Sequence, residues 1–94
     1  MKLSYYAVFE YAPDGINITF PDVPALSCAV DEEEGRVMAV EALALCLHGM
    51  SPEGIPPPSR LEDIALGDGC KAFPITVEME IRDGRLFSDG VVEF

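Results

Sequence analysis

The chain has 94 residues, of which 49% are hydrophobic and 24% charged, a balance that indicates one globular domain and excludes a disordered chain. Seventeen acidic against six basic side chains give a formal net charge of -11. A field of that sign repels phosphate backbones, so we expect no direct DNA or RNA binding, whereas a basic protein partner is favoured.

The first third of the chain predicts a meander of three antiparallel strands. Residues 4–11 and 16–20 alternate with a period of two, and Pro13–Gly15 supplies the turn between them. A short third strand over 25–30 follows Pro21–Pro24, where proline ends the ladder. The side chains expected to face the core are Leu3, Tyr5, Ala7, Phe9, Tyr11, Ile16, Ile18, Phe20, Leu26, Cys28 and Val30.

A long helix is expected next, running to about Met50. Asp31 as N-cap, with Glu34 three residues later, forms a capping-box pattern, and three consecutive glutamates complement the positive end of the helix dipole. The acidic run therefore needs no ligand to explain it. Gly35 should weaken the first turn by about 1 kcal/mol relative to alanine. The expected core face comprises Val37, Val40, Ala44 and Leu47, widened by Met38, Leu43 and Leu45.

A proline-rich connector follows the helix. Residues 51–59 should run extended over the surface, because their prolines exclude helix and central strand. Ser59 and Glu62 repeat the capping-box pattern, which predicts a short second helix to about Leu66.

The clearest strand lies near the end of the chain. Residues 73–82 alternate apolar and polar side chains, and Asp83–Gly84 is a strong hairpin signal. Leu86–Phe87 and Val91–Val92 could pair back across that turn or dock elsewhere. The fold class predicted for the single domain, residues 1–94, is therefore α+β, with the order β-β-β-α-β, one long helix packed on an antiparallel sheet and a short second helix.

The order of these motifs resembles the N-terminal domain of HicB antitoxins. The resemblance rests on Tyr5–Glu10, Phe20–Pro24, the acidic helix start and Ile55–Ser59, and it covers roughly residues 3–81. It implies a partial ribonuclease H-like fold with the fourth strand beside the first. It also implies an antitoxin that binds and neutralises a small basic HicA-type toxin, an mRNA interferase, without catalysis of its own.

Two departures from the family pattern stand out. The family usually has glycine after Val23–Pro24, where this chain has Ala25. After Ile81 only Arg82 and Arg85 are basic, so nothing matches the DNA-binding element that many HicB proteins carry. We therefore expect no separate DNA-binding domain and no operon repression by this chain alone.

The sheet face turned away from the helix is the candidate partner-binding site. A mixed aromatic and acidic surface suits a basic toxin or a second copy of the chain. An unpaired edge strand would also need covering, which favours a homodimer or a higher homo-oligomer. The candidate partner-binding residues are Tyr6, Val8, Glu10, Asn17, Thr19, Asp22, Glu78 and Glu80, with Ser27 and Thr76 expected on the same face.

Two other functions remain open alternatives. One is a stand-alone HicB-like oligomeric regulatory protein without a toxin. The other is a metal-dependent nuclease, whose carboxylates would have to converge around a divalent cation; the candidates are Glu10, Asp22, Asp31, Glu78 and Glu80. Exposed carboxylates are usually just solvated, and strand parity does not make these converge.

The remaining reactive side chains favour no enzyme. His48, the single histidine, lies near the helix end without a signalled orienting carboxylate or nucleophile. Cys28, Cys46 and Cys70 are odd in number and lack metal-ligand spacing, so we interpret them as buried, reduced thiols. No secretory signal is visible, and the longest apolar stretch, 37–47, is too short to cross a bilayer. We predict a cytoplasmic, non-catalytic protein without a metal or other cofactor.

Overall fold

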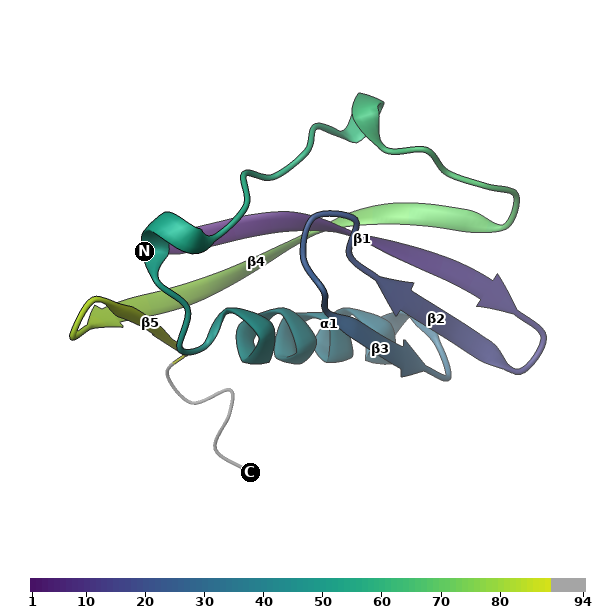
Figure 1. Ribbon diagram of the computed structural model, residues 1–94. Coiled ribbons are helices and arrows are strands. Elements are labelled where there is room, and N and C mark those ends of the chain that lie inside the picture. The colour runs from purple at the N-terminus through teal and green to yellow at the C-terminus, as the bar shows by residue number, and fades with distance from the viewer. Residues whose placement is uncertain (89–94) are drawn as a thin grey trace.

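A computed structural model describes residues 1–88, in which five strands form a curled antiparallel sheet and one long helix packs on one of its faces (Figure 1). The strands run in the order β3-β2-β1-β4-β5 across the sheet. This confirms the α+β class, the three-stranded meander and the fourth strand beside the first. The elements are β1 Lys2–Ala12, β2 Gly15–Thr19, β3 Leu26–Ala29, α1 Glu32–Leu47, β4 Cys70–Arg82 and β5 Arg85–Ser88.

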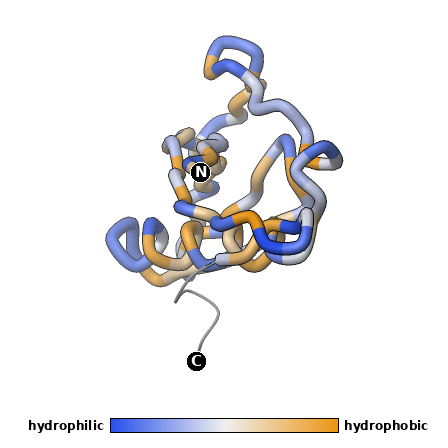
Figure 2. Tube along the Cα trace, turned by 90° about the vertical axis from the view of Figure 1, so that its left-hand side faces the viewer, coloured by the Kyte–Doolittle hydropathy of each residue, from blue (hydrophilic) through white to orange (hydrophobic). Residues whose placement is uncertain are grey.

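The central strands follow the predicted alternation. Tyr5, Ala7 and Phe9 of β1 are buried beneath α1, while their neighbours in sequence point to the opposite face. Figure 2 shows hydrophobic and hydrophilic residues following one another along the chain, with hydrophilic turns at the periphery. The antiparallel pairing of β1 with β4 extends from Lys2 opposite Glu78 to Glu10 opposite Cys70. These two long strands are therefore the frame of the sheet.

The hairpin between β4 and β5 forms as predicted. Asp83 and Gly84 have φ angles of 52° and 74°, the left-handed conformations that a two-residue type I′ turn requires. Leu86 then pairs with Ile81 and is fully buried, at 0% exposure. The predicted partner segment Val91–Val92 lies outside the described residues.

The predicted capping box at the start of α1 is confirmed. Asp31 Oδ1 accepts the backbone N–H of Glu34 at 2.8 Å, and Glu34 Oε1 accepts the N–H of Val30 at 3.1 Å. The helix ends at Leu47 and not at Met50. Beyond it the N–H of Gly49 donates to the carbonyl of Leu86 at 2.6 Å, so the chain leaves the helix to pair with β5.

The predicted core face of α1 was partly wrong. Val37 and Leu45 are 57% and 51% exposed. Four of the buried residues, Gly35, Ala39, Leu43 and Leu47, recur every four positions, and the fifth, Ala44, adjoins Leu43; together they form the stripe that meets the sheet. A Cβ on Gly35 would lie 2.7 Å from Cε2 of Phe9. Glycine at this position therefore allows the helix to approach the sheet closely.

The predicted faces of β3 were also wrong. Leu26 pairs with Thr19 and Cys28 with Asn17, so these two side chains share the face turned away from α1, and Ser27 has the opposite orientation. The reason is the bend at Phe20–Pro24, which is not a strand. It contributes Val23 to the core and resets the alternation before β3 begins.

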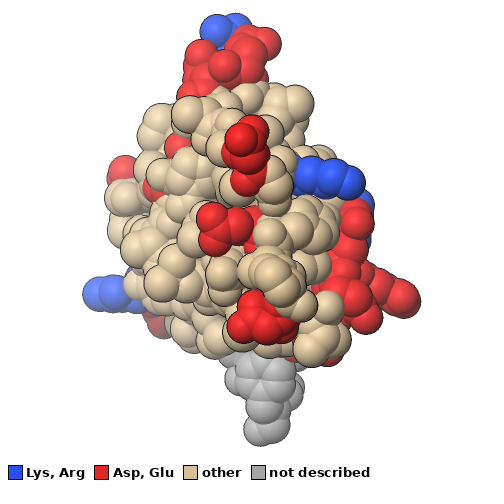
Figure 3. All heavy atoms as spheres, turned by 90° about the vertical axis from the view of Figure 1, so that its right-hand side faces the viewer, with Lys and Arg blue, Asp and Glu red and all other residues tan. Residues whose placement is uncertain are grey.

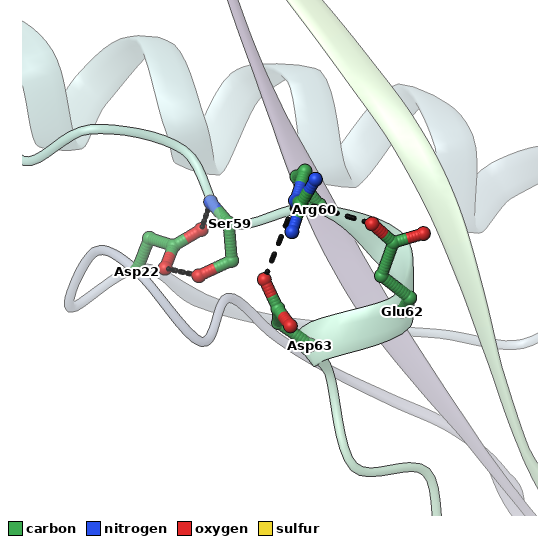
Figure 4. A network of polar contacts seen from close by, with 5 residues as sticks. All are labelled: Asp22, Ser59, Arg60, Glu62 and Asp63. Carbon is green, nitrogen blue, oxygen red and sulfur yellow. Dashed lines mark hydrogen bonds and ion pairs between the residues drawn. The ribbon is translucent and has the colours of Figure 1, made fainter.

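The predicted second helix does not form. Leu61–Asp63 is only a 3₁₀ turn, and so is Pro52–Gly54, within the segment expected to be extended. Ser59 does not cap a helix. Its N–H and Oγ donate instead to the two carboxylate oxygens of Asp22, at 2.8 and 2.6 Å (Figure 4). A contact with a residue 37 positions away thus outweighs the local capping signal.

Candidate protein-binding surface

The sheet face opposite α1 is a surface that α1 leaves uncovered. Within residues 1–88 the long helix lies on the other side of the sheet (Figure 1). The connector between α1 and β4, residues 48–69, passes beside β1, with Pro58–Glu62 near Ser4 and Tyr6. We call the sheet face opposite α1 the outer sheet face. The side chains that β1 to β4 place on it, by strand register, are Lys2, Ser4, Tyr6, Val8, Glu10, Asn17, Thr19, Leu26, Cys28, Cys70, Ala72, Pro74, Thr76, Glu78 and Glu80.

A row of three apolar side chains and one threonine crosses the outer sheet face, and we call it the apolar row. Leu26 of β3 lies beside Thr19 of β2, Thr19 beside Val8 of β1, and Val8 beside Ala72 of β4. Leu26 is 74% exposed. Residues directly opposite each other on neighbouring strands are in side-chain contact distance, so the row is continuous. A row of this kind offers a partner apolar area to bury.

The candidate carboxylates lie at the two ends of the sheet. Glu10 accepts a hydrogen bond from Asn17 Nδ2 at 3.5 Å and pairs with Cys70. Glu78 pairs with Lys2 and accepts from the N-terminal amine at 3.3 Å. Glu78 lies opposite Lys2, and Lys2 and Glu10 are eight residues apart on β1. The backbone positions of Glu10 and Glu78 are therefore roughly 26 Å apart along the strand direction. The two carboxylates flank the apolar row and do not converge.

The distance between Glu10 and Glu78 argues against a metal site formed by both, as the alternative of a metal-dependent nuclease would need. Glu10 and Glu78 cannot share one cation at that distance, and in the described part of the chain no group of three or more His, Cys, Asp or Glu side chains is placed to hold a metal ion. The carboxylates are instead dispersed. On the side of the molecule drawn in Figure 3, acidic side chains are scattered among uncharged ones, with basic groups at the margins.

Asp22 differs from the other seven candidate residues, which lie on the outer sheet face. Its carboxylate is used within the fold, where it binds Ser59 and fastens the connector. Beside it, the hydroxyl of Tyr5 donates to the carbonyl of Pro56 at 2.5 Å. Burial raises the pKa of Tyr5, and the charges of Asp22 and Cys46 raise it further. Asp22 is therefore a tether of the connector.

A groove between the connector and the outer sheet face was not predicted. It has a volume of about 500 Å³, and its lining includes Ser4, Tyr6, Pro58, Arg60, Leu61, Glu62 and Pro74. The guanidinium of Arg60 is held by Glu62 at 3.1 Å and by Asp63 at 3.6 Å (Figure 4). The proline-rich run signalled a connector, but not that it would pass beside β1.

His48 and the cysteines have no shared arrangement. His48 is the C-cap of α1. Its Nδ1 accepts the N–H of Ser88 at 3.3 Å, and its ring packs edge-on against Phe87. This fixes β5 against the helix end. Burial raises the pKa of the Cys46 thiol. The prediction of buried thiols was wrong for Cys28, which is exposed because β3 turns it to the outer sheet face.

Comparisons with known proteins do not identify a family for this chain. No family model matches the sequence, and a search of the curated proteins gives no significant match. Within the described residues no helix has both the length and the apolar character needed to span a membrane. The case for a function therefore depends on the outer sheet face and on the order of the sequence motifs.

Proposed function

We propose that this chain is a non-catalytic, cytoplasmic HicB-like antitoxin with a partial ribonuclease H-like fold. It binds and neutralises a small basic HicA-type mRNA interferase through the outer sheet face. The order of strands in the sheet, with β4 beside β1 and α1 between β3 and β4 in sequence, supports the fold assignment.

The observation that carries the proposal is the apolar row between carboxylates on a sheet face without a helix. A protein interface typically combines an apolar centre with a polar rim. Here Val8 and Leu26 supply the centre, and Glu10 and Glu78 lie at the rim. Tyr6, beside the groove, adds an aromatic side chain of the kind enriched at binding hot spots.

The negative net charge of this chain favours a partner with a positive net charge. A net charge of -11 attracts a basic protein and speeds the encounter by electrostatic steering. Salt screens that attraction, since the Debye length falls from about 30 Å at 0.01 M to about 3 Å at 1 M ionic strength. We expect the association rate to fall steeply with salt and the dissociation rate to change little.

The test uses any small basic protein that is encoded beside this gene. Co-expression should restore the growth that this basic protein inhibits, and the two proteins should co-purify. Val8→Glu places a charge in the apolar row and should weaken binding by about tenfold or more. Val37→Glu is the matched control, because the same substitution then lies on the exposed side of α1.

The proposal fails if no basic neighbour is toxic or co-purifies. It also fails if Val8→Glu, shown to be folded by circular dichroism, neutralises the toxin as well as Val37→Glu does. Loss of neutralisation in the Val37→Glu variant alone would move the binding surface to α1.

A further inference from the structure

The two outermost strands of the sheet differ in how their free edges are covered. Along β5, the N–H of Gly49 donates to the carbonyl of Leu86, and the N–H of Leu86 donates to Met50 at 2.8 Å. In residues 1–88, β3 pairs with β2 alone. Because alternate residues of a strand direct their backbone groups to opposite sides, half of those of β3 face an uncovered edge.

The side chains on this edge do not discourage pairing. Leu26 is 74% exposed and Val30, directly after the strand, is 73% exposed, with the exposed Cys28 between them. Natural edge strands are usually protected by a lysine, a proline or a bulge. The strand itself, Leu26–Ala29, contains no charged residue and no proline.

The pattern along the edge is self-complementary. When two identical strands pair antiparallel about a two-fold axis, the residue on the axis lies opposite its own copy. A residue a given number of positions before it then lies opposite the residue the same number of positions after it in the other chain. When Cys28 lies opposite its own copy, Leu26 of each chain lies opposite Val30 of the other. The two most exposed apolar side chains of the edge then cover each other.

We infer that β3 pairs with β3 of a second copy of this chain about a two-fold axis at Cys28, which joins two sheets into one of ten strands. The edge supplies the backbone hydrogen bonds, and Leu26 and Val30 supply the apolar contact. Glu34, which accepts the N–H of Val30, must release it for the outermost hydrogen bond of the pair to form.

This dimer and the proposed toxin contact both use Leu26, but the dimer leaves Val8 free. Val8 lies two strands from the edge, roughly 10 Å away, so the part of the outer sheet face around it stays accessible. Salt separates the two associations. Like charge on both copies opposes dimerisation, so added salt should strengthen the dimer, whereas it should weaken binding of a basic toxin.

The pairing is small, so the dimer should be weak. Two strands of four residues bury less than the roughly 1,200 Å² that stable complexes reach, and we expect a dissociation constant in the micromolar range. Sedimentation velocity from about 5 to 500 μM at low and high salt measures it. Leu26→Glu should shift the dissociation constant at least about tenfold, and Leu45→Glu, on exposed α1 surface, should leave it unchanged.

Cross-linking tests the register. Opposed residues of an antiparallel pair have Cα atoms about 4.5–5.5 Å apart, within disulfide range. A variant whose single cysteine is Cys28 should form a disulfide dimer when diamide accepts the two electrons and two protons of the thiols. A variant retaining only Cys70, three strands away on the same face, should not.

The inference is overturned if the chain stays monomeric at 500 μM in high salt. A dimer that tolerates Leu26→Glu and does not cross-link through Cys28 overturns it equally. Neither result affects the proposed function, whose test uses Val8 and a basic partner.

Discussion

The two faces of the sheet are built from alternate residues of the same strands, yet they have different physical tasks. On β1, Phe9 is fully buried under α1, while its neighbour Val8 lies in the apolar row of the outer sheet face. A change on the inner face should therefore alter the free energy of unfolding. A change on the outer face should alter partner affinity and leave stability within about 0.5 kcal/mol.

The largest effect is expected from the inner face. Leu43 of α1 has 0% exposure and belongs to the stripe against the sheet. Leu43→Ala should lower the free energy of unfolding by about 2–5 kcal/mol, through lost burial and the cavity that remains. Urea titration measures the loss. Leu45→Ala, on the exposed side of the same helix, is the control, and equal losses in the two variants would contradict the assignment of faces.

A smaller loss is expected at the close approach of α1 to β1. Gly35→Ala adds a methyl group 2.7 Å from the ring of Phe9, and such overpacking costs about 1–3 kcal/mol. Helix propensity acts in the opposite direction by about 1 kcal/mol. We expect net destabilisation by thermal melting. Gly54→Ala, which has open space around the new Cβ, should melt like the parent; a stabilised Gly35→Ala variant would refute the contact.

The connector gives the next effect. Asp22→Ala removes both acceptors of Ser59, which should cost about 1–3 kcal/mol in urea titration. Ser59→Ala removes only the hydroxyl donor and should cost less. Because Asp22 is occupied within the fold, the folded Asp22→Ala protein should bind the basic partner with unchanged affinity. A large loss of affinity at unchanged stability would return Asp22 to the binding surface.

The smallest effect is a loss of stability in alkali. Burial raises the pKa of Tyr5 in the folded state above about 10, its unfolded value. Below pH 10 both states keep the proton and the contribution is complete. As the pH rises through 10 the unfolded state ionises first, so the free energy of unfolding falls. Urea titrations between pH 9 and 11 should show a shallower fall for Tyr5→Phe than for Tyr6→Phe; equal slopes would contradict this origin.

The features that were predictable from the sequence are local ones. The alternation in β1, β2 and β4, the Asp83–Gly84 turn and the Asp31 cap each depend on residues within a few positions. Side-chain parity then placed seven of the eight candidate partner residues on the outer sheet face, as the strand registers show.

The features that failed depend on contacts distant in sequence. The second helix is absent because Ser59 binds Asp22, and Gly35 has its role because of Phe9. The orientation of Leu26 follows from a bend whose buried Val23 no periodicity reveals. The groove likewise exists only because the connector returns beside β1, which the tether at Asp22 fixes.

The central claim is that a basic partner binds the outer sheet face. Methyl NMR spectra of the chain with and without its basic partner test this most directly. We expect the methyl signals of Val8 and Ala72 to shift on binding, and those of Val37 and Leu45 on α1 to stay in place. Shifts confined to Val37 and Leu45, with Val8 and Ala72 unchanged, would contradict the claim.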